Sequence, residues 1–198
     1  MARTTIGEEP VGGPVETVLG FVNSRADGTG RTERFGSAAD FSAWARERGL
    51  IGDETVSESE AVAARELRAA LLMMLLAHSA HQEATPEQIM AAERQLTHAA
   101  GLYPVRIAIS AAGSTVTGHN RGAAHVFGDV LAAANEIIQR GDWHRMKACC
   151  SHPCRHGFMD RTKNGAQMYC GSTCSSRAAM RTMRERRRTQ QDTSPTGT

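Results

Sequence analysis

The chain has 198 residues, 40% of them hydrophobic, and a formal net charge of +2, which suits one domain with its own core plus a small additional module. Its longest apolar run, residues 69–77, is far shorter than the roughly 20 residues of a membrane-spanning helix, so we expect no membrane span. No basic stretch followed by an apolar one marks the N-terminus as a secretory signal, and we expect a cytoplasmic protein with reduced thiols.

The small net charge conceals an uneven distribution. Residues 1–139 contain 11 Lys and Arg against 17 Asp and Glu, a net charge of −6. Residues 140–188 contain 12 Lys and Arg against 3 Asp and Glu, a net charge of +9. An acidic body followed by a basic end indicates that the end contacts a polyanion.

The first elements are short. Residues 1–13 are polar and contain several glycines, a composition that predicts disorder. Residues 15–22 form an apolar element whose type the pattern leaves open. Ser37 is a suitable N-cap for a helix, which we expect to end at Gly49.

Two longer helices follow. Ser57 and Glu60 have the spacing of a capping box and begin a helix that we expect to run to about His81. Apolar residues cover much of its circumference, so it should be the central helix of the domain. A second helix begins after Thr85, has a proline in its first turn, and should end at Gly101.

The remainder of the body predicts one hairpin and one helix. Residues 105–109 and 114–118 favour β-strands around a glycine-containing turn. Residues 121–140 have helical periodicity, with Ile138 among the residues expected to face inward, and Gly141 ends the helix. We therefore predict a mostly α fold with a small β-hairpin, and a helical N-terminal domain over residues 14–141.

All five cysteines lie near the C-terminus. The pairs Cys149-x4-Cys154 and Cys170-x3-Cys174 are typical of a zinc site with four thiolates. Spacing alone would also allow Cys150 to replace Cys149, and disulfides or free thiols are the alternative for the whole cluster. Four sulfur ligands leave no coordination position for water, so we expect one structural Zn²⁺ and no enzyme activity.

The segment between the cysteine pairs predicts a second hairpin. Asn164–Gly165 is a strong turn signal between two apolar pairs, residues 158–159 and 168–169. The following helix should hold Cys174 in its first turn. Knuckle, hairpin and helix together predict a treble-clef-like zinc finger over residues 142–188.

A basic helix should follow the last cysteine. Its arginines are expected to contact nucleic acid, four of them in one stripe and Arg186 and Arg187 beside it: Arg177, Arg181, Arg184, Arg186, Arg187 and Arg188. Arg161 and Lys163, in the turn between the cysteine pairs, are further candidates. His152 and His156 are expected to face solvent or phosphate, and residues 189–198 to be disordered.

These features predict a DNA-binding protein. Aromatic residues near the basic helix are restricted to Phe158 and Tyr169, which favours duplex DNA over stacking on single-stranded RNA. An RNA-binding or ribosome-associated protein, or a zinc-braced protein-interaction module, are the alternatives. The body could serve as a dimerisation or sensing domain, and a homodimer is possible from the architecture alone.

The chain resembles the CGNR zinc-finger family, bacterial proteins with an N-terminal ABATE domain that are described as stress-induced transcription regulators. The resemblance in the finger rests on residues 143–149 (WHRMKAC), 154–161 (CRHGFMDR), 169–170 (YC) and 174–177 (CSSR). In the body it rests on residues 19–24 (LGFVNS), residues 37–50 with Trp44, and residues 65–71 (RELRAAL).

The resemblance implies a zinc-finger regulator in which Cys149 is the first ligand. The chain also departs from the family pattern. The name-giving CGNR is here Cys174-Ser175-Ser176-Arg177, and Tyr169 replaces the usual tryptophan. These changes leave the expected fold intact, whereas a DNA sequence preference does not transfer.

Overall fold

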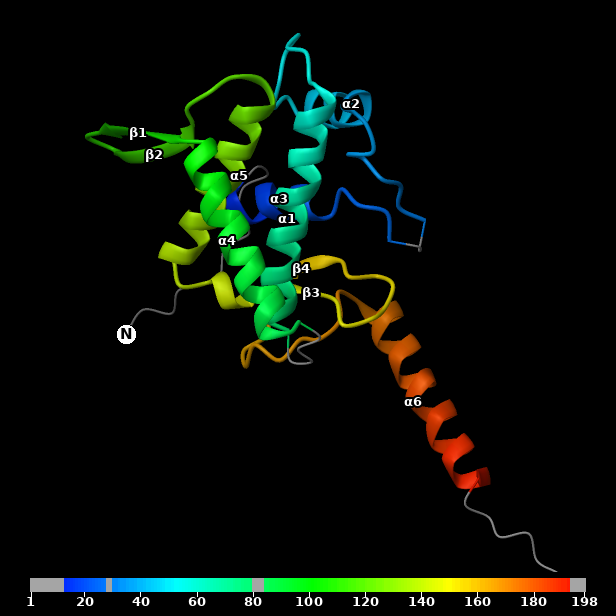
Figure 1. The fold of residues 1–198 in the computed structure, drawn as a ribbon. Coiled ribbons are helices and arrows are strands. Elements are labelled where there is room, and N and C mark those ends of the chain that lie inside the picture. Colours follow the sequence, from blue (N-terminus) through cyan, green and yellow to red (C-terminus); the bar gives the residue numbers. More distant parts are fainter. Residues whose placement is uncertain (1–12, 28–29, 80–83, 193–198) are drawn as a thin grey trace, which may run out of the picture.

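A computed structural model describes residues 13–27, 30–79 and 84–192 of the protein (Figure 1). These residues form six α-helices, one short 3-10 helix and two antiparallel two-stranded sheets, which confirms the mostly helical fold class. The segments predicted to be disordered lie largely outside the described residues, at 1–12 and 193–198. No helix in the described part is both long and apolar enough to cross a membrane.

The first two helices both contact the helix of residues 58–77. α1 spans Pro14–Val22, so the apolar element of open type is a helix, with proline at its first turn. α2 spans Ala38–Glu47 and begins as predicted, because the Ser37 side chain accepts a hydrogen bond from the Asp40 N–H. Gly49, just after α2, adopts a φ of 65°, a conformation that favours glycine.

The central helix is α3, Glu58–Ala77. The predicted capping box forms, since the Ser57 and Glu60 side chains each accept a hydrogen bond from the other's backbone N–H. α3 ends earlier than the predicted limit of about His81, which itself lies outside the described residues. α4, Pro86–Leu102, begins after Thr85 as predicted, also has a capping box, formed by Thr85 and Gln88, and packs along α3.

The first hairpin and the next helix complete the body. β1, Val105–Ser110, pairs with β2, Gly113–Gly118, and both are almost entirely exposed as they project from the body (Figure 1). α5, Gly122–Gln139, packs on α1 and β2. Ile138 does not face inward as predicted. It is 46% exposed, because one residue turns the helix by about 100° away from the buried Ile137.

The core of the body is aromatic. Neighbouring rings lie 4.9 to 6.3 Å apart between centroids, within the range of attractive edge-to-face and offset contacts. The rings come from α1, α2, α5 and the loop between α1 and α2: Phe21, Phe35, Phe41, Trp44 and Phe127. This cluster joins α1, α2 and α5 in one core.

The C-terminal module begins with a 3-10 helix, Trp143–Arg145, and the strand β3, Met146–Ala148. β3 pairs with β4, Gly157–Met159, and lies against α3. α6, Ser172–Asp192, then extends away from the body (Figure 1), four residues beyond the expected end of the basic helix at Arg188.

The predicted second hairpin is wrong. Asn164–Gly165 does form a turn, with Gly165 at a φ of 61°, but residues 168–169 form no strand. The backbone there is bound elsewhere: the N–H of Gln167 donates to the Asp160 carboxylate, and the Met168 carbonyl accepts from Cys150. β4 therefore pairs with β3 instead.

Candidate metal centre

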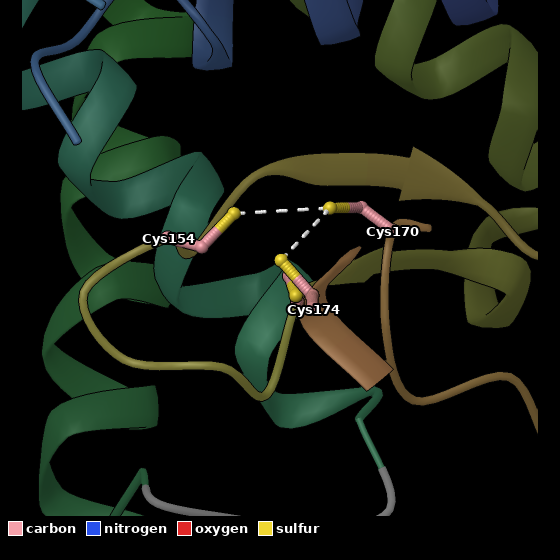
Figure 2. Close-up of side chains that lie close together, drawn as sticks. Cys154, Cys170 and Cys174 are labelled. Carbon is pink, nitrogen blue, oxygen red and sulfur yellow. Dashed lines mark hydrogen bonds between the residues drawn. The ribbon is translucent and has the colours of Figure 1, made fainter. Parts of the chain in front are cut away.

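Four cysteine sulfurs lie together at the start of α6, and three of them, those of Cys154, Cys170 and Cys174, are labelled in Figure 2. All four Sγ atoms are within 4.8 Å of one another, and they belong to Cys149, Cys154, Cys170 and Cys174. The Cys154–Cys170 and Cys170–Cys174 sulfurs are 3.7 and 3.8 Å apart. Ligands about 2.3 Å from a tetrahedral ion would lie about 3.8 Å apart, so the four can bind one metal ion.

The structure distinguishes Cys149 from Cys150. The Cys149 N–H donates to the His156 carbonyl at 2.8 Å, which continues the β3–β4 pairing and places the Cys149 sulfur in the cluster. The half-buried Cys150 thiol is not part of this group, and the Cys150 N–H donates to Met168. All five cysteines are free, so the disulfide alternative does not hold.

The thiols do not ionise alike. Burial raises the pKa of Cys170 and of Cys174. Burial also opposes ionisation of Cys154, but hydrogen bonds from the His156 N–H and from neighbouring thiols lower its pKa below the ordinary value. Four thiolates at this spacing therefore need a positive charge among them, and a structural zinc ion supplies it.

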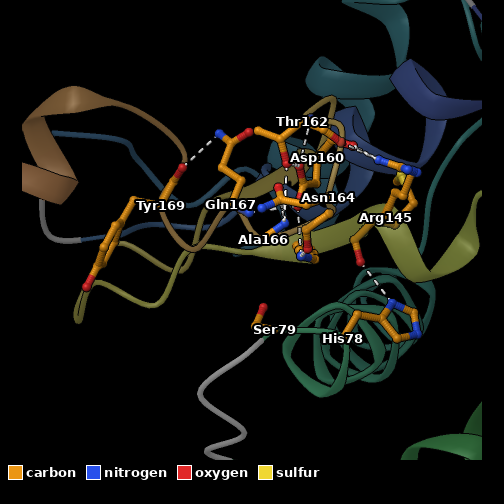
Figure 3. A network of polar contacts seen from close by, with 12 residues as sticks. His78, Ser79, Arg145, Asp160, Thr162, Asn164, Ala166, Gln167 and Tyr169 are labelled. Carbon is orange, nitrogen blue, oxygen red and sulfur yellow. Dashed lines mark hydrogen bonds and ion pairs between the residues drawn. The ribbon is translucent and has the colours of Figure 1, made fainter.

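A buried carboxylate organises the turn between the cysteine pairs (Figure 3). The Asp160 side chain is fully buried and accepts from Lys147 Nζ at 2.8 Å, from the Thr162 N–H and hydroxyl at 2.9 and 2.5 Å, and from the Gln167 N–H at 2.9 Å. Burial alone would raise the pKa of Asp160, yet these donors hold it far below the usual range. Lys147 also donates to the Gly165 carbonyl, so one ion pair fixes β3 to the turn.

Three side chains of the body hold the finger in place. The Asn23 side chain donates to the Gly157 carbonyl at 3.0 Å and accepts from its N–H at 2.7 Å. At the end of α3, His78 Nδ1 donates to the Met146 carbonyl and the Ser79 hydroxyl to the Ala148 carbonyl, both at 2.8 Å. His78 and Ser79 directly follow Ala77, so these two bonds attach the C-terminal end of α3 to β3.

Two histidines of the finger differ in environment. His152 is exposed, and its carbonyl accepts from Arg181 at 3.3 Å. His156 is half-buried, against the expectation that it faces solvent or phosphate, and it contacts Asn23 and Arg31. Burial and the Arg31 charge lower the pKa of His156. Neither histidine belongs to the metal cluster found among the described residues.

The arginines of α6 are all exposed, and in the described part of the chain none of the six forms an ion pair: Arg177, Arg181, Arg184, Arg186, Arg187 and Arg188. Arg161 and Lys163 are exposed in the turn between the cysteine pairs. The 3.6-residue repeat places Arg177, Arg181, Arg184 and Arg188 within roughly 60° of one another, with Arg187 to one side. Arg186 lies on the opposite face of the helix, not beside the stripe.

Sequence reasoning missed the body residues that support the metal centre. Asn23 and Arg31 lie more than 120 residues before the segments they bind, and Arg31 also reaches the Cys154 sulfur at 3.8 Å. The segment 19–24 carried part of the family resemblance, which was the one available signal for Asn23. Arg31 had none.

Comparison with known families agrees with this arrangement. Residues 16–140 match the ABATE model, described as "Putative stress-induced transcription regulator", and residues 145–187 match the CGNR zinc-finger model. No curated protein matches the chain. The ABATE match covers more than half of the chain and the cysteine cluster lies inside the zinc-finger match, so the protein belongs to the ABATE family and carries a C-terminal CGNR zinc finger.

Proposed function

We propose that the protein is a transcription regulator that binds duplex DNA through α6, with Cys149, Cys154, Cys170 and Cys174 holding one structural zinc ion. One observation carries the proposal: an exposed helix bears six arginines without ionic partners in the described structure, and its first turn contains the last cysteine of the cluster. The positive charges of these arginines repel one another unless a polyanion is present.

The metal would fix the direction of the helix. Cys174 is the third residue of α6, and Cys170 lies two residues before the helix start, so one ion would join the helix to the β3–β4 pair. A rigid start matters because a helix enters the major groove in a defined register only when its orientation is set. We assign the zinc no catalytic role, since four thiolates would fill its coordination shell.

The arginine stripe predicts an oriented contact. Arg177, Arg181, Arg184 and Arg188 share one face, and guanidinium groups bind phosphate oxygens or the guanine edge. Arg161 and Lys163 extend the basic surface from the turn of the finger. Glu185 is the single acidic residue between Arg177 and Arg188, so little within the helix competes for these side chains.

The test compares two double variants of equal charge. Arg181→Ala/Arg184→Ala removes two members of the stripe, and Arg186→Ala/Arg187→Ala removes two charges outside it. With a mixed-sequence duplex in a salt series, the first should lower affinity at least tenfold and reduce the log–log salt slope by about 2, and the second should change affinity less than threefold. Fluorescence anisotropy measures both quantities.

Four results would contradict the proposal. Equal losses in the two double variants would mean that α6 acts as undirected charge. An unchanged slope in the stripe variant would remove α6 from the contact surface. Stronger binding of structured RNA at equal salt would favour the RNA-binding alternative, and binding of neither nucleic acid would favour a protein-interaction module.

A further inference from the structure

A cleft of about 730 Å³ lies between the body and the zinc finger. The body contributes α1, the loop after it and the C-terminal end of α2, and the finger contributes residues 156–159 and Arg161. The volume is in the range of small-molecule sites, which occur preferentially between structural modules. None of the matches described above assigns a ligand to it.

The cleft is rich in arginine. Arg31, Arg34, Arg48 and Arg161 line it, against two acidic residues, Glu16 and Glu47. Arginine side chains in a concave site are suited to a carboxylate or phosphate group, which they bind through paired N–H donors.

Two of these arginines, Arg48 and Arg161, are not held in a close ion pair within the described residues, so their guanidinium groups can bind a ligand. The Arg48 guanidinium lies 4.7 Å above the Trp44 ring, and its nearest ionic contact, to Glu47, is at the long distance of 4.0 Å. Arg161 is exposed and forms no ion pair within the described residues. By contrast, Arg34 is paired with Glu47.

Trp44 supplies a second, independent observation. It lines the cleft and is only 2% exposed, yet its Nε1–H has no hydrogen-bond acceptor in the described structure. A buried N–H without an acceptor is rare and calls for a partner. Leu19, Phe158 and Met159 add apolar surface to the same cleft.

We propose that this cleft binds a small organic anion, a carboxylate or phosphate ester with an apolar body, between the ABATE domain and the zinc finger. The anionic group would bind the arginines, of which Arg48 lies over the Trp44 ring, and the apolar part would lie on Leu19, Phe158 and Met159. The ligand would contact both walls, and the finger wall includes Gly157, which Asn23 binds through two hydrogen bonds. The proposal does not depend on DNA binding.

The probes are phenyl phosphate and benzoate, with benzyl alcohol as the neutral analogue. Trp44 reports binding through its fluorescence in the zinc-loaded full chain, with Trp143→Phe as background so that one tryptophan remains. At constant ionic strength, at least one anion should bind saturably and at least tenfold more tightly than benzyl alcohol. Comparing the two anions separates a phosphate ligand from a carboxylate ligand.

Gly20 offers a matched pair of variants. It lies in α1 on the cleft wall, and a Cβ there would have one neighbour within 4 Å, Arg48 Nε at 3.9 Å. Gly20→Glu places a carboxylate beside Arg48, whereas Gly20→Gln has the same size without charge. We expect Gly20→Glu to weaken anion binding at least tenfold and Gly20→Gln less than threefold, with folding checked by circular dichroism. Arg48→Gln, at an exposed position, should weaken binding tenfold as well.

The proposal is overturned by any of four results. Absence of saturable binding by both anions would refute it directly. Equal weakening by Gly20→Glu and Gly20→Gln, or equal affinity for benzyl alcohol, would show that charge is not recognised. Displacement of phenyl phosphate by duplex DNA, with a matching loss of duplex affinity in Gly20→Glu, would make the cleft part of a nucleic-acid surface.

Discussion

Replacing Asp160 by asparagine should destabilise the protein more than any other single change in the turn of the zinc finger. The carboxylate accepts four hydrogen bonds from donors, one of them the Lys147 ammonium, whose side chain is 5% exposed. Asparagine has one acceptor oxygen and turns an NH₂ group toward donors. The buried Lys147 ammonium then loses its negatively charged partner, while its hydrogen bond to the Gly165 carbonyl remains.

The size of the effect follows from the burial. Removing one partner of a buried ion pair costs about 3–5 kcal/mol. We expect about 4 kcal/mol for Asp160→Asn, about a thousandfold in the folding equilibrium. Lys147→Met should cost about 2 kcal/mol, because Asp160 keeps its donors from Thr162 and Gln167. The exposed Lys163 is the matched control, and Lys163→Met should change stability by less than about 0.5 kcal/mol.

Urea unfolding of the zinc-saturated variants, followed by circular dichroism, measures these differences. The finger shares a core with the body through β3, so global unfolding reports on its stability. A loss below about 1 kcal/mol in Asp160→Asn would refute the reasoning. So would an equal loss in Lys147→Met, since the asymmetry between the partners is what the geometry requires.

Three further predictions follow from single features. Cys149→Ser should abolish tight binding of one zinc per chain, whereas Cys150→Ser should keep full stoichiometry and four sulfur ligands, as measured by X-ray absorption; retention of zinc by the first variant contradicts the cluster. Gly157→Ala should lower the free energy of unfolding in urea by about 1–3 kcal/mol. Its Cβ would lie 3.1 Å from one leucine methyl carbon of α1 and one of α3. An unchanged stability would mean that these side chains move away freely. Burial opposes the charge of Glu33, but hydrogen bonds from Arg68 and the backbone lower its pKa, so its contribution to stability is present above about pH 4.3 and is lost as the pH falls below that value. The stability difference between wild type and Glu33→Gln should therefore shrink on acidification, and a difference that grew would reverse the assigned sign.

Local signals in the sequence were sufficient for helix starts and for the cysteine cluster. Ser57 and Thr85 cap their helices because a capping box depends on four consecutive residues. The segment 15–22 has apolar residues with i, i+3, i+4 and i+7 spacing, a helical signal that its short length obscured. Cysteine spacing restricted the metal site to two choices for its first ligand.

The features that the sequence did not predict depend on contacts between distant segments. Asn164–Gly165 is a genuine turn, but Asp160 and Cys150 capture the backbone that would have formed the second strand. Nothing in the local sequence announces those partners. The cleft between body and finger is likewise assembled from residues more than 100 positions apart, so periodicity and spacing could not reveal it.

The location of β3 has a consequence for how the two modules can be recombined. Met146 and Ala148 belong to the zinc-finger match, but both are fully buried in the core cluster that is made mostly of residues from the ABATE match. A zinc finger transplanted into a chimera would expose these two side chains to solvent. The body from which it was taken would be left with a cavity in its core. The two modules of this chain are therefore matched to each other at β3. An exchange of zinc fingers between homologues should succeed only when the recipient body keeps its own β3 residues.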